Sequence, residues 1–290
     1  MPRDLVVLTN PVAGKGRALA VRDAGIARLR AAGHRVHAVA GRDAGDALDL
    51  ARKAVADRVD ALVVCGGDGL VSLALQALAG SDVPLGFLPA GTGNDAARSV
   101  GVPLGDAVAA ADQILRWRPR PMDLARTGDR WFGTVLAAGI DAVVNERANR
   151  MSWPRGQMRY NLATIAELRV FEPLRYQLDL DGRHLALEAM LVAVGNGPSF
   201  GGGLRIAEGA VLDDGLLDVV VIGPLSKAEL VRTYPKLFKG THVDHPAFQR
   251  HRVRRVTVAS PGIVAYADGE RLGPLPLTVE CVPGAITVLA

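Results

Sequence analysis

The feature that most constrains this chain is an apolar run that breaks into glycines around one carboxylate, Val63-Val64-Cys65-Gly66-Gly67-Asp68-Gly69. A second apolar run ends soon afterwards in a similar loop, Gly91-Thr92-Gly93-Asn94-Asp95. Continuously apolar strands are typical of parallel sheets, and ligands bind beyond the carboxyl ends of such strands. Glycine also lets a backbone approach a phosphate closely. The sequence therefore predicts one phosphate-binding site built from two adjacent loops.

Strands and helices alternate with short links through residues 1–122, which predicts an open parallel α/β domain. The predicted strands cover residues 4–9, 34–40, 60–65 and 84–88. The predicted helices cover residues 18–32, 44–56 and 70–78, with a last one from 96 that stops before Pro103.

Residues 123–290 have a different pattern from residues 1–122, because short strands with period-two alternation, separated by turn residues, predominate. The predicted strands cover residues 123–125, 131–138, 174–180, 185–194, 215–222, 254–259, 262–267 and 277–282. Helical inserts are predicted over about 141–171 and 227–239. We expect an antiparallel, sandwich-like second domain whose last strand is able to pack back on the first.

Composition limits the function classes. The 290 residues carry 34 Lys and Arg against 30 Asp and Glu, a net charge of +4. This suits a protein that handles phosphates or touches an anionic surface, but it is too weak for a dedicated nucleic-acid binder. The two cysteines lie in apolar runs and are expected to be reduced core thiols. No apolar run is long enough to span a bilayer and no signal peptide is evident, which predicts a cytoplasmic protein.

The first strand also opens into a loop that could bind an anion. Asn10-Pro11 is followed by Gly14-Lys15-Gly16 and then by an alanine-rich helix, a geometry that presents backbone N–H groups to an anion. This is not a Walker A loop, because Arg17 stands where a Ser or Thr would be needed.

The polar residues of the two glycine loops could each have either a structural or a ligand-binding role. Asp68 could cap a helix, or it could serve Mg²⁺, because a carboxylate beside a phosphate is repulsive unless a cation mediates. Thr92, Asn94 and Asp95 could each cap a helix too. Their joint occurrence in the loop next to Asp68 favours a shared nucleotide site.

Two further clusters lie in the second domain. Asp268-Gly269-Glu270 is either a plain hairpin turn or a pair of carboxylates able to deprotonate an alcohol. The glycines of residues 196–203 indicate a close approach of backbone. Asp213-Asp214-Gly215 could hold a cation through one carboxylate and flanking carbonyls, or form a plain turn.

Taken in order, these motifs resemble the diacylglycerol kinase catalytic-domain family, which includes bacterial soluble lipid kinases and sphingosine kinases and is distantly similar to NAD kinases. The resemblance covers essentially the whole chain. Residues 146–154, with Arg159 and Tyr160, look most like the actinobacterial members. One departure is Leu70, where the family usually has Thr after Gly-Gly-Asp-Gly.

The resemblance implies a two-domain kinase with Mg-ATP in the cleft between the domains. It implies a general base at Glu270, assisted by Asp268, with Asp68 also catalytic. It implies a structural Mg²⁺ held by the Asp214 side chain and the Val211 and Leu216 carbonyls. Asp68 and Asp95 would lie at the Mg-ATP. The implied nucleotide-binding residues are Asn10, Gly14, Lys15, Gly66, Gly67, Asp68, Gly69, Gly91, Thr92, Asn94 and Asp95.

The implied reaction is phosphoryl transfer from ATP to a lipid hydroxyl, with diacylglycerol giving phosphatidic acid. Sphingosine or a phosphatidylinositol-linked lipid could replace diacylglycerol, since apolar acyl pockets are unspecific in sequence. NAD kinase-like chemistry is an alternative; Asn145-Glu146 superficially fits it, but lies far downstream of Asp68. A non-catalytic nucleotide-binding regulator is less favoured, because both Asp68 and Glu270 are retained.

A lipid acceptor requires contact with a membrane surface. Four arginines surround Met151, Trp153 and Met158 in the first helical insert, which suits an interfacial anchor at the inner membrane face or an ordinary solvated face. The sequence leaves the oligomeric state open, with a homodimer among the options.

Overall fold

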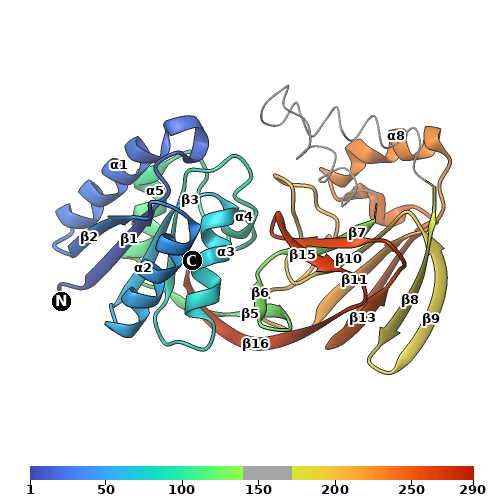
Figure 1. Ribbon diagram of the computed structural model, residues 1–290. Helices are drawn as coiled ribbons and strands as arrows, with labels where there is room; N and C mark the ends of the chain where they lie inside the picture. Colours follow the sequence, from blue (N-terminus) through green and yellow to red (C-terminus); the bar gives the residue numbers. More distant parts are fainter. Residues whose placement is uncertain (140–171) are drawn as a thin grey trace.

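The computed structural model describes residues 1–139 and 172–290. The N-terminal strands form a parallel sheet in the order β2-β1-β3-β4. Helices α1 and α5 pack together, as do α2 and α3, and cover this sheet (Figure 1). The strands are β1 (Asp4–Thr9), β2 (Arg35–Ala40), β3 (Ala61–Gly66) and β4 (Leu85–Pro89). The helical elements are η1 (Ala13–Gly16), α1 (Ala18–Ala31), α2 (Ala44–Ala56), α3 (Asp68–Leu78), α4 (Asp95–Ser99) and α5 (Ala107–Leu115).

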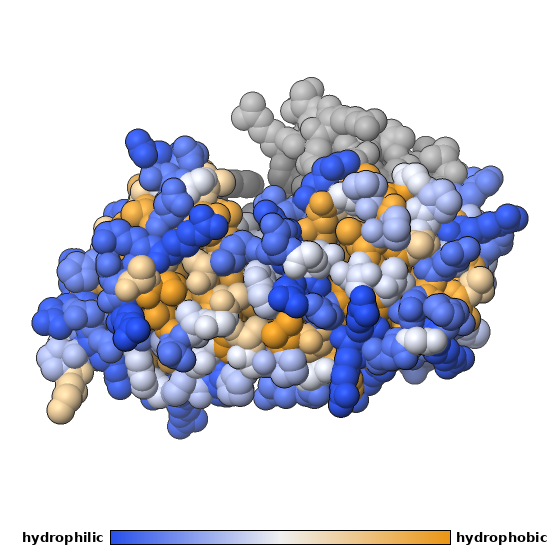
Figure 2. Space-filling model, turned by 60° about the horizontal axis from the view of Figure 1, so that its bottom comes forward, coloured by the Kyte–Doolittle hydropathy of each residue, from blue (hydrophilic) through white to orange (hydrophobic). Residues whose placement is uncertain are grey.

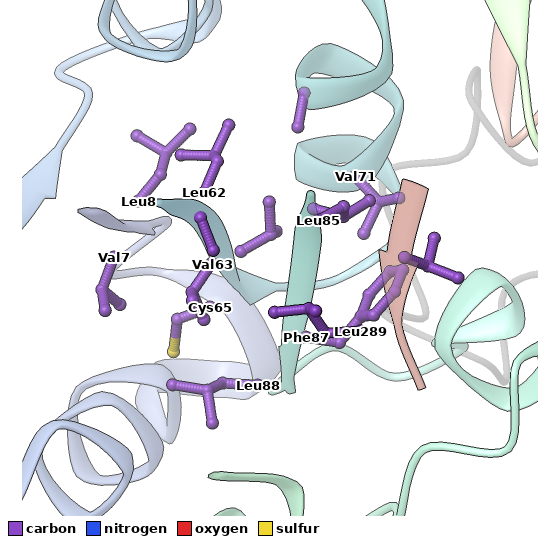
Figure 3. Close-up of a cluster of buried hydrophobic side chains, with 14 of the residues drawn as sticks. Val7, Leu8, Leu62, Val63, Cys65, Val71, Leu85, Phe87, Leu88 and Leu289 are labelled. Atoms are coloured by element: carbon purple, nitrogen blue, oxygen red, sulfur yellow. The ribbon is translucent and has the colours of Figure 1, made fainter. Parts of the chain in front are cut away.

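The core of this region explains why its central strands lack alternation. Every residue of β3 is buried, because helices cover both faces of the sheet. Figure 3 shows Val63, Phe87 and Leu88 in the same cluster as Leu289, which comes from the end of the chain. Helix α5 was not predicted, although Asp106 marks its start by accepting the Val108 and Ala109 N–H groups.

The second region contributes antiparallel strands to two sheets. A six-stranded sheet has the order β12-β11-β10-β7-β14-β15, while β5, β6, β8, β9, β13 and β16 belong to the ten-stranded sheet that includes the N-terminal strands. The early strands are β5 (Pro119–Thr127), β6 (Arg130–Phe132), β7 (Val135–Gly139), β8 (Leu174–Leu180), β9 (Arg183–Ala189) and β10 (Leu191–Gly195). The later elements are β11 (Leu217–Ile222), α8 (Lys227–Leu237), η2 (Thr241–Asp244), β12 (Phe248–Val253), β13 (Arg255–Ala259), β14 (Val264–Ala267), β15 (Glu270–Pro274) and β16 (Leu277–Leu289).

The architecture predicted from the sequence, parallel α/β followed by an antiparallel sandwich, is confirmed, but several predicted strands were wrong in extent. The strands predicted over 123–125 and 277–282 are longer, β5 and β16. Residues 131–138 and 185–194 each divide into two strands that belong to different sheets. In the second case the burial pattern changes from alternating in β9 to fully buried in β10, because β10 lies inside the six-stranded sheet. Strands β12 and β15 were missed. The insert predicted over 141–171 lies outside the described residues.

Strands β5 and β16 connect the two regions along one side of the molecule (Figure 1). They pair antiparallel over most of their length, and Val288 of β16 pairs in parallel with Leu85 of β4. In Figure 2, which brings this side forward, hydrophilic side chains predominate and hydrophobic ones show between them. No helix among residues 1–139 and 172–290 is long and apolar enough to cross a membrane.

Candidate active site

The two glycine-rich loops of the first region are in direct contact. The Ala90 and Gly91 N–H groups both donate to the Gly66 carbonyl, at 2.9 and 3.1 Å. A Cβ atom added to Gly91 would lie 2.4 Å from the Cα of Gly67. The loops meet so closely that glycine is required on at least one side, and the backbone is left exposed where a ligand could approach.

The loop after β1 joins the same group. Gly14 has a φ of +58°, and a Cβ there would lie 2.0 Å from the Ala90 carbonyl oxygen. Asn10 accepts the Val12 N–H through its side chain at 3.2 Å and donates its own N–H to the Cys65 carbonyl at 3.1 Å. Lys15 belongs to η1, but its side chain lies outside what the structure describes.

Asp68 links the two glycine loops through its side chain. It stands at the start of α3, yet its carboxylate accepts the N–H groups of Asn94 (2.7 Å) and Ala96 (3.3 Å). These donors belong to the first turn of α4, which has no intrahelical acceptors for them. Asp68 therefore does cap a helix, but the helix is that of the neighbouring loop.

Among the described residues, the charged groups that influence Asp68 are carboxylates. Burial and the negative charge of Asp95, with a smaller effect from Asp268, raise the pKa of Asp68 to about 6, although the two N–H donors oppose the shift. Three carboxylates from two regions of the chain are thus close enough to influence one another. A divalent cation bound among them would relieve this repulsion.

Asp95 reaches across to the second region. Its buried carboxylate accepts the Ser199 hydroxyl at 3.1 Å and the Gly202 N–H at 2.6 Å. The nearest described cation is the guanidinium of Arg98, whose Nε lies 4.0 Å away. Asp95 therefore holds the loop of residues 196–203 against the β4–α4 loop.

In the rest of the Gly91–Asp95 loop, Asn94 shapes the backbone, whereas the Thr92 side chain forms no hydrogen bond with a described residue. Asn94 has a φ of +56°, and its side-chain amide bonds both the N–H and the carbonyl of Gly91 at 2.9 Å. Thr92 is exposed, and its hydroxyl has no hydrogen bond within the described part of the chain. Leu70 packs into the core and donates its N–H to Gly67 at 3.0 Å.

Asp268 and Glu270 lie on the β14–β15 hairpin and differ sharply. Asp268 has a φ of +50°, and its carboxylate accepts three hydrogen bonds, from the Gly133 N–H (2.9 Å), the Thr134 N–H (3.0 Å) and the Thr134 hydroxyl (2.5 Å). Burial nevertheless raises the pKa of Asp268. These contacts tie the hairpin to the β6–β7 link, so Asp268 orients the turn that carries Glu270.

Glu270 is exposed, and its carboxylate has no hydrogen-bond partner among residues 1–139 and 172–290, although its backbone pairs with Ala267 in the hairpin. Its Oε1 lies 3.6 Å from the position of a Cβ built on Gly69. The hairpin of the second region therefore holds a free carboxylate beside the Gly66–Gly69 loop of the first, at the N-terminal end of α3. A carboxylate so placed can accept a proton.

The three residues predicted to hold a structural Mg²⁺ lie in the segment before β11. The Asp214 carboxylate accepts the Leu216 N–H at 3.0 Å and pairs with the guanidinium of Arg252, so its charge is already compensated. Val211 is exposed. Among the described residues no three His, Cys, Asp or Glu side chains gather as a metal cluster. The structural Mg²⁺ stays a prediction.

Asp123 was missed as a site-supporting residue. Its buried carboxylate accepts the Gly215 and Gly284 N–H groups, each at 2.7 Å, and its own N–H donates to Leu212 at 2.7 Å. It therefore links β5 to β16 and to the segment around Asp214. One signal was present, because an isolated acid within the apolar run of β5 must find partners when it is buried.

Comparison with known proteins identifies the family to which the chain belongs. Residues 4–127 match the diacylglycerol kinase catalytic domain, and residues 134–290 match the YegS C-terminal NAD kinase beta sandwich-like domain. The fold and site thus define a two-domain kinase class. The chain is 46% identical to a diacylglycerol kinase of Mycobacterium tuberculosis, over 98% of this chain and 94% of that protein. It therefore belongs to the diacylglycerol kinase family of lipid kinases, as its motifs indicated.

More distant relatives agree with this membership. A Pseudomonas fluorescens protein named "Probable lipid kinase YegS-like" is 33% identical, over 91% of this chain and 89% of that one. A crystal structure from Bacillus anthracis, described as a diacylglycerol kinase, superposes with a TM-score of 0.81 at 25% identity, covering 99% of this chain and 96% of the other. The likeness extends through both regions of the fold.

Proposed function

We propose that this chain is an ATP-dependent lipid kinase that transfers the γ-phosphoryl group of ATP to the hydroxyl of a diacylglycerol, giving phosphatidic acid. The observation that carries the proposal is the Glu270 carboxylate, unpaired within the described part of the chain, beside Gly69, where the hairpin of one region faces the glycine-rich loops of the other. The names of the Mycobacterium tuberculosis and Bacillus anthracis relatives support diacylglycerol as the acceptor class.

On the donor side, the exposed backbone of the glycine loops and the free Thr92 hydroxyl would bind the phosphates, with the N-terminal end of α3 adding a favourable dipole. The half-buried Asp68 carboxylate and the buried Asp95 carboxylate fit a Mg²⁺ ion, because each oxygen keeps a lone pair beyond the hydrogen bonds described above. When bound, Mg²⁺ neutralises charge on the phosphates.

On the acceptor side, Glu270 would take the proton of the lipid hydroxyl as its oxygen attacks the γ-phosphorus. The bond between that phosphorus and the β–γ bridging oxygen breaks, and ADP leaves with the electron pair. Asp268 holds the hairpin and does not take the proton, because three donors already occupy its carboxylate.

The test is a kinase assay on purified protein with Mg-ATP and dispersed diacylglycerol. We expect Glu270→Gln to lower kcat by about 100-fold or more, as loss of a general base does. Glu188→Gln is the matched control, because Glu188 is an exposed carboxylate on β9 far from the glycine loops. Near-full activity of Glu270→Gln would remove Glu270 from the mechanism.

A screen of acceptors addresses the competing substrates. Diacylglycerol, sphingosine, phosphatidylinositol and NAD would be offered with labelled ATP, and the products would be separated by thin-layer chromatography. We expect label in phosphatidic acid. Label confined to NADP would instead support the NAD kinase-like alternative, and ATP binding without turnover of any acceptor would support a regulator.

A lipid acceptor further implies that the protein works at a membrane surface from the cytoplasmic side. The basic segment 146–160, for which the sequence allows either an interfacial anchor or an ordinary solvated face, lies outside the described residues, so its role stays a prediction. Absence of nucleic-acid binding and the oligomeric state also stay predictions.

A further inference from the structure

Helix α8 (Lys227–Leu237) packs one face against the core, and its other face exposes both apolar and basic side chains. It lies along the outer edge of the second region, away from the first (Figure 1). Leu230 and Leu237 pack against the cluster under the six-stranded sheet, and Thr233 between them is buried. These three residues recur at helical spacing and define the face that the fold uses.

The exposed face of α8 carries apolar side chains. Val231 is 59% exposed and Phe238, at the end of the helix, is 45% exposed. With Pro235, which is also exposed, they recur at i, i+4 and i+7, so they form one stripe. The Tyr234 ring packs edge-on against Phe238, with ring centroids 5.8 Å apart, but the described residues leave much of the stripe exposed to water.

Basic side chains flank this stripe. Lys227 lies on one side of it, and Arg232, Lys236 and Lys239 lie on the other, by helical spacing. All four are exposed and make no ion pair with a described residue. Glu229 is the one acidic residue in the same stretch, and Ser226 holds its carboxylate in a capping box. The helix surface is therefore apolar with a cationic border.

We propose that α8 is the element that docks this protein on an anionic lipid surface, an inference that rests on the proposed lipid kinase function. Helices that lie in a bilayer interface combine an apolar stripe with Lys and Arg that reach the headgroups. The charges favour lipid over a second copy of the chain, because two such faces would bring eight cationic groups together.

The position of α8 relative to the site supports this role. The carbonyl of Leu237 accepts the Arg205 N–H at 2.9 Å. A few residues earlier in the same segment, the Gly202 N–H donates to Asp95 in the candidate active site. Helix α8 thus packs on the segment that holds Asp95 of the candidate active site, so the docking element and the site share one structural connection.

The experiment is co-sedimentation of the full chain with phosphatidylcholine vesicles that contain or lack phosphatidylglycerol, without ATP. One variant combines Val231→Glu with Phe238→Glu, and a second replaces Lys227, Arg232, Lys236 and Lys239 by Gln. Val108→Glu is the apolar control, since Val108 is 46% exposed on α5. The charge control replaces Arg42, Arg52, Lys53 and Arg175 by Gln, which removes the same charge from exposed positions elsewhere.

We expect both α8 variants to bind anionic vesicles roughly tenfold more weakly or worse, while both controls bind like the unsubstituted protein. Their circular dichroism spectra and Tm should match those of the unsubstituted protein, which shows that they fold. Unchanged vesicle binding by both α8 variants would overturn the proposal. So would light scattering that shows a dimer, without lipid, that Val231→Glu with Phe238→Glu dissociates. Vesicle binding is measured without catalysis, so failure of the kinase assay leaves this result readable.

Discussion

At the scale of single residues, two neighbouring carboxylates on one hairpin have separate tasks. Asp268 accepts three hydrogen bonds, whereas Glu270 accepts none from a described residue. We expect Asp268→Ala to destabilise the protein by about 2 kcal/mol or more, because the Gly133 and Thr134 donors lose their acceptor. Glu270→Gln should leave Tm unchanged. Thermal unfolding of both variants measures this, and equal Tm values would contradict the division of tasks.

The raised pKa of Asp68 predicts that both stability and kcat/KM for ATP depend on pH. Its pKa is raised to about 6 by burial and by Asp95, so the side chain is protonated below that pH and ionised above it. Because the folded protein binds this proton more tightly than the unfolded chain, Asp68 contributes to the free energy of unfolding. That contribution is fully present below pH 3.8, the pKa of the carboxyl in the unfolded chain, and is lost as the pH rises through about 6. If binding of Mg-ATP needs the ionised form, kcat/KM for ATP should rise through about pH 6.

The pH profile of kcat/KM checks this, with Asp68→Asn as the comparison. We expect the asparagine variant to lose the rising limb near pH 6 together with most of its activity. An unchanged limb in that variant would assign the titration to another group. The limb of kcat should lie at lower pH than that of kcat/KM, because a bound cation lowers the pKa of the carboxylates around it.

At the scale of elements, the glycine loops offer a matched pair of substitutions. Gly14 and Gly16 both have positive φ, but a Cβ on Gly14 meets the Ala90 carbonyl at 2.0 Å, whereas one on Gly16 meets nothing within 4 Å. Gly14→Ala should therefore push the loop after β1 away from the β4–α4 loop. We expect a KM for ATP raised about tenfold or more, while Gly16→Ala shows only the strain of its φ, about 1–2 kcal/mol.

Steady-state kinetics and Tm of the two alanine variants distinguish steric contact from backbone strain. Similar losses in both would mean that φ alone matters. A normal KM in Gly14→Ala would separate this loop from the nucleotide site altogether.

The elements show where sequence reasoning succeeds and where it stops. Buried strands, helices and hairpin turns follow from local patterns, so β3, α2 and β8 were predicted almost to the residue. The division of residues 185–194 between two sheets was missed, because the chain remains apolar as it passes from one to the other. Strand β15 begins at Glu270 and alternates too weakly to be recognised.

For the site, the sequence supplied the residues but not their partners. Local spacing placed Asp68 and Asp95 at the carboxyl ends of β3 and β4. It could not place the Ser199 hydroxyl on Asp95, or Glu270 beside Gly69, because those contacts depend on how the two regions pack. The helix-capping reading and the ligand reading of Asp68 are compatible, since its carboxylate can accept N–H groups and still face a cation.

At the scale of the whole molecule, β5 and β16 cross between the two regions, and buried carboxylates hold the crossing in place. Asp123 accepts the Gly284 N–H within β16 and the Gly215 N–H at the start of the segment leading to β11. Asp95 joins the regions again at the site. The packing of the two regions at the candidate site therefore depends on these buried carboxylates.

Asp123→Ala tests this dependence. Two N–H groups, of the half-buried Gly215 and the exposed Gly284, would lose their buried acceptor at the crossing. Each loss destabilises by about 1 kcal/mol, so we expect a clear fall in Tm and a loss of activity that is partly recovered at low temperature. Asp129→Ala is the control, because Asp129 is exposed in the turn between β5 and β6. Asp123→Asn should recover part of the stability, since its amide oxygen can accept one of the two N–H groups. Calorimetry gives the Tm values, and equal values for Asp123→Ala and Asp129→Ala would show that β5 and β16 hold the two regions without this carboxylate.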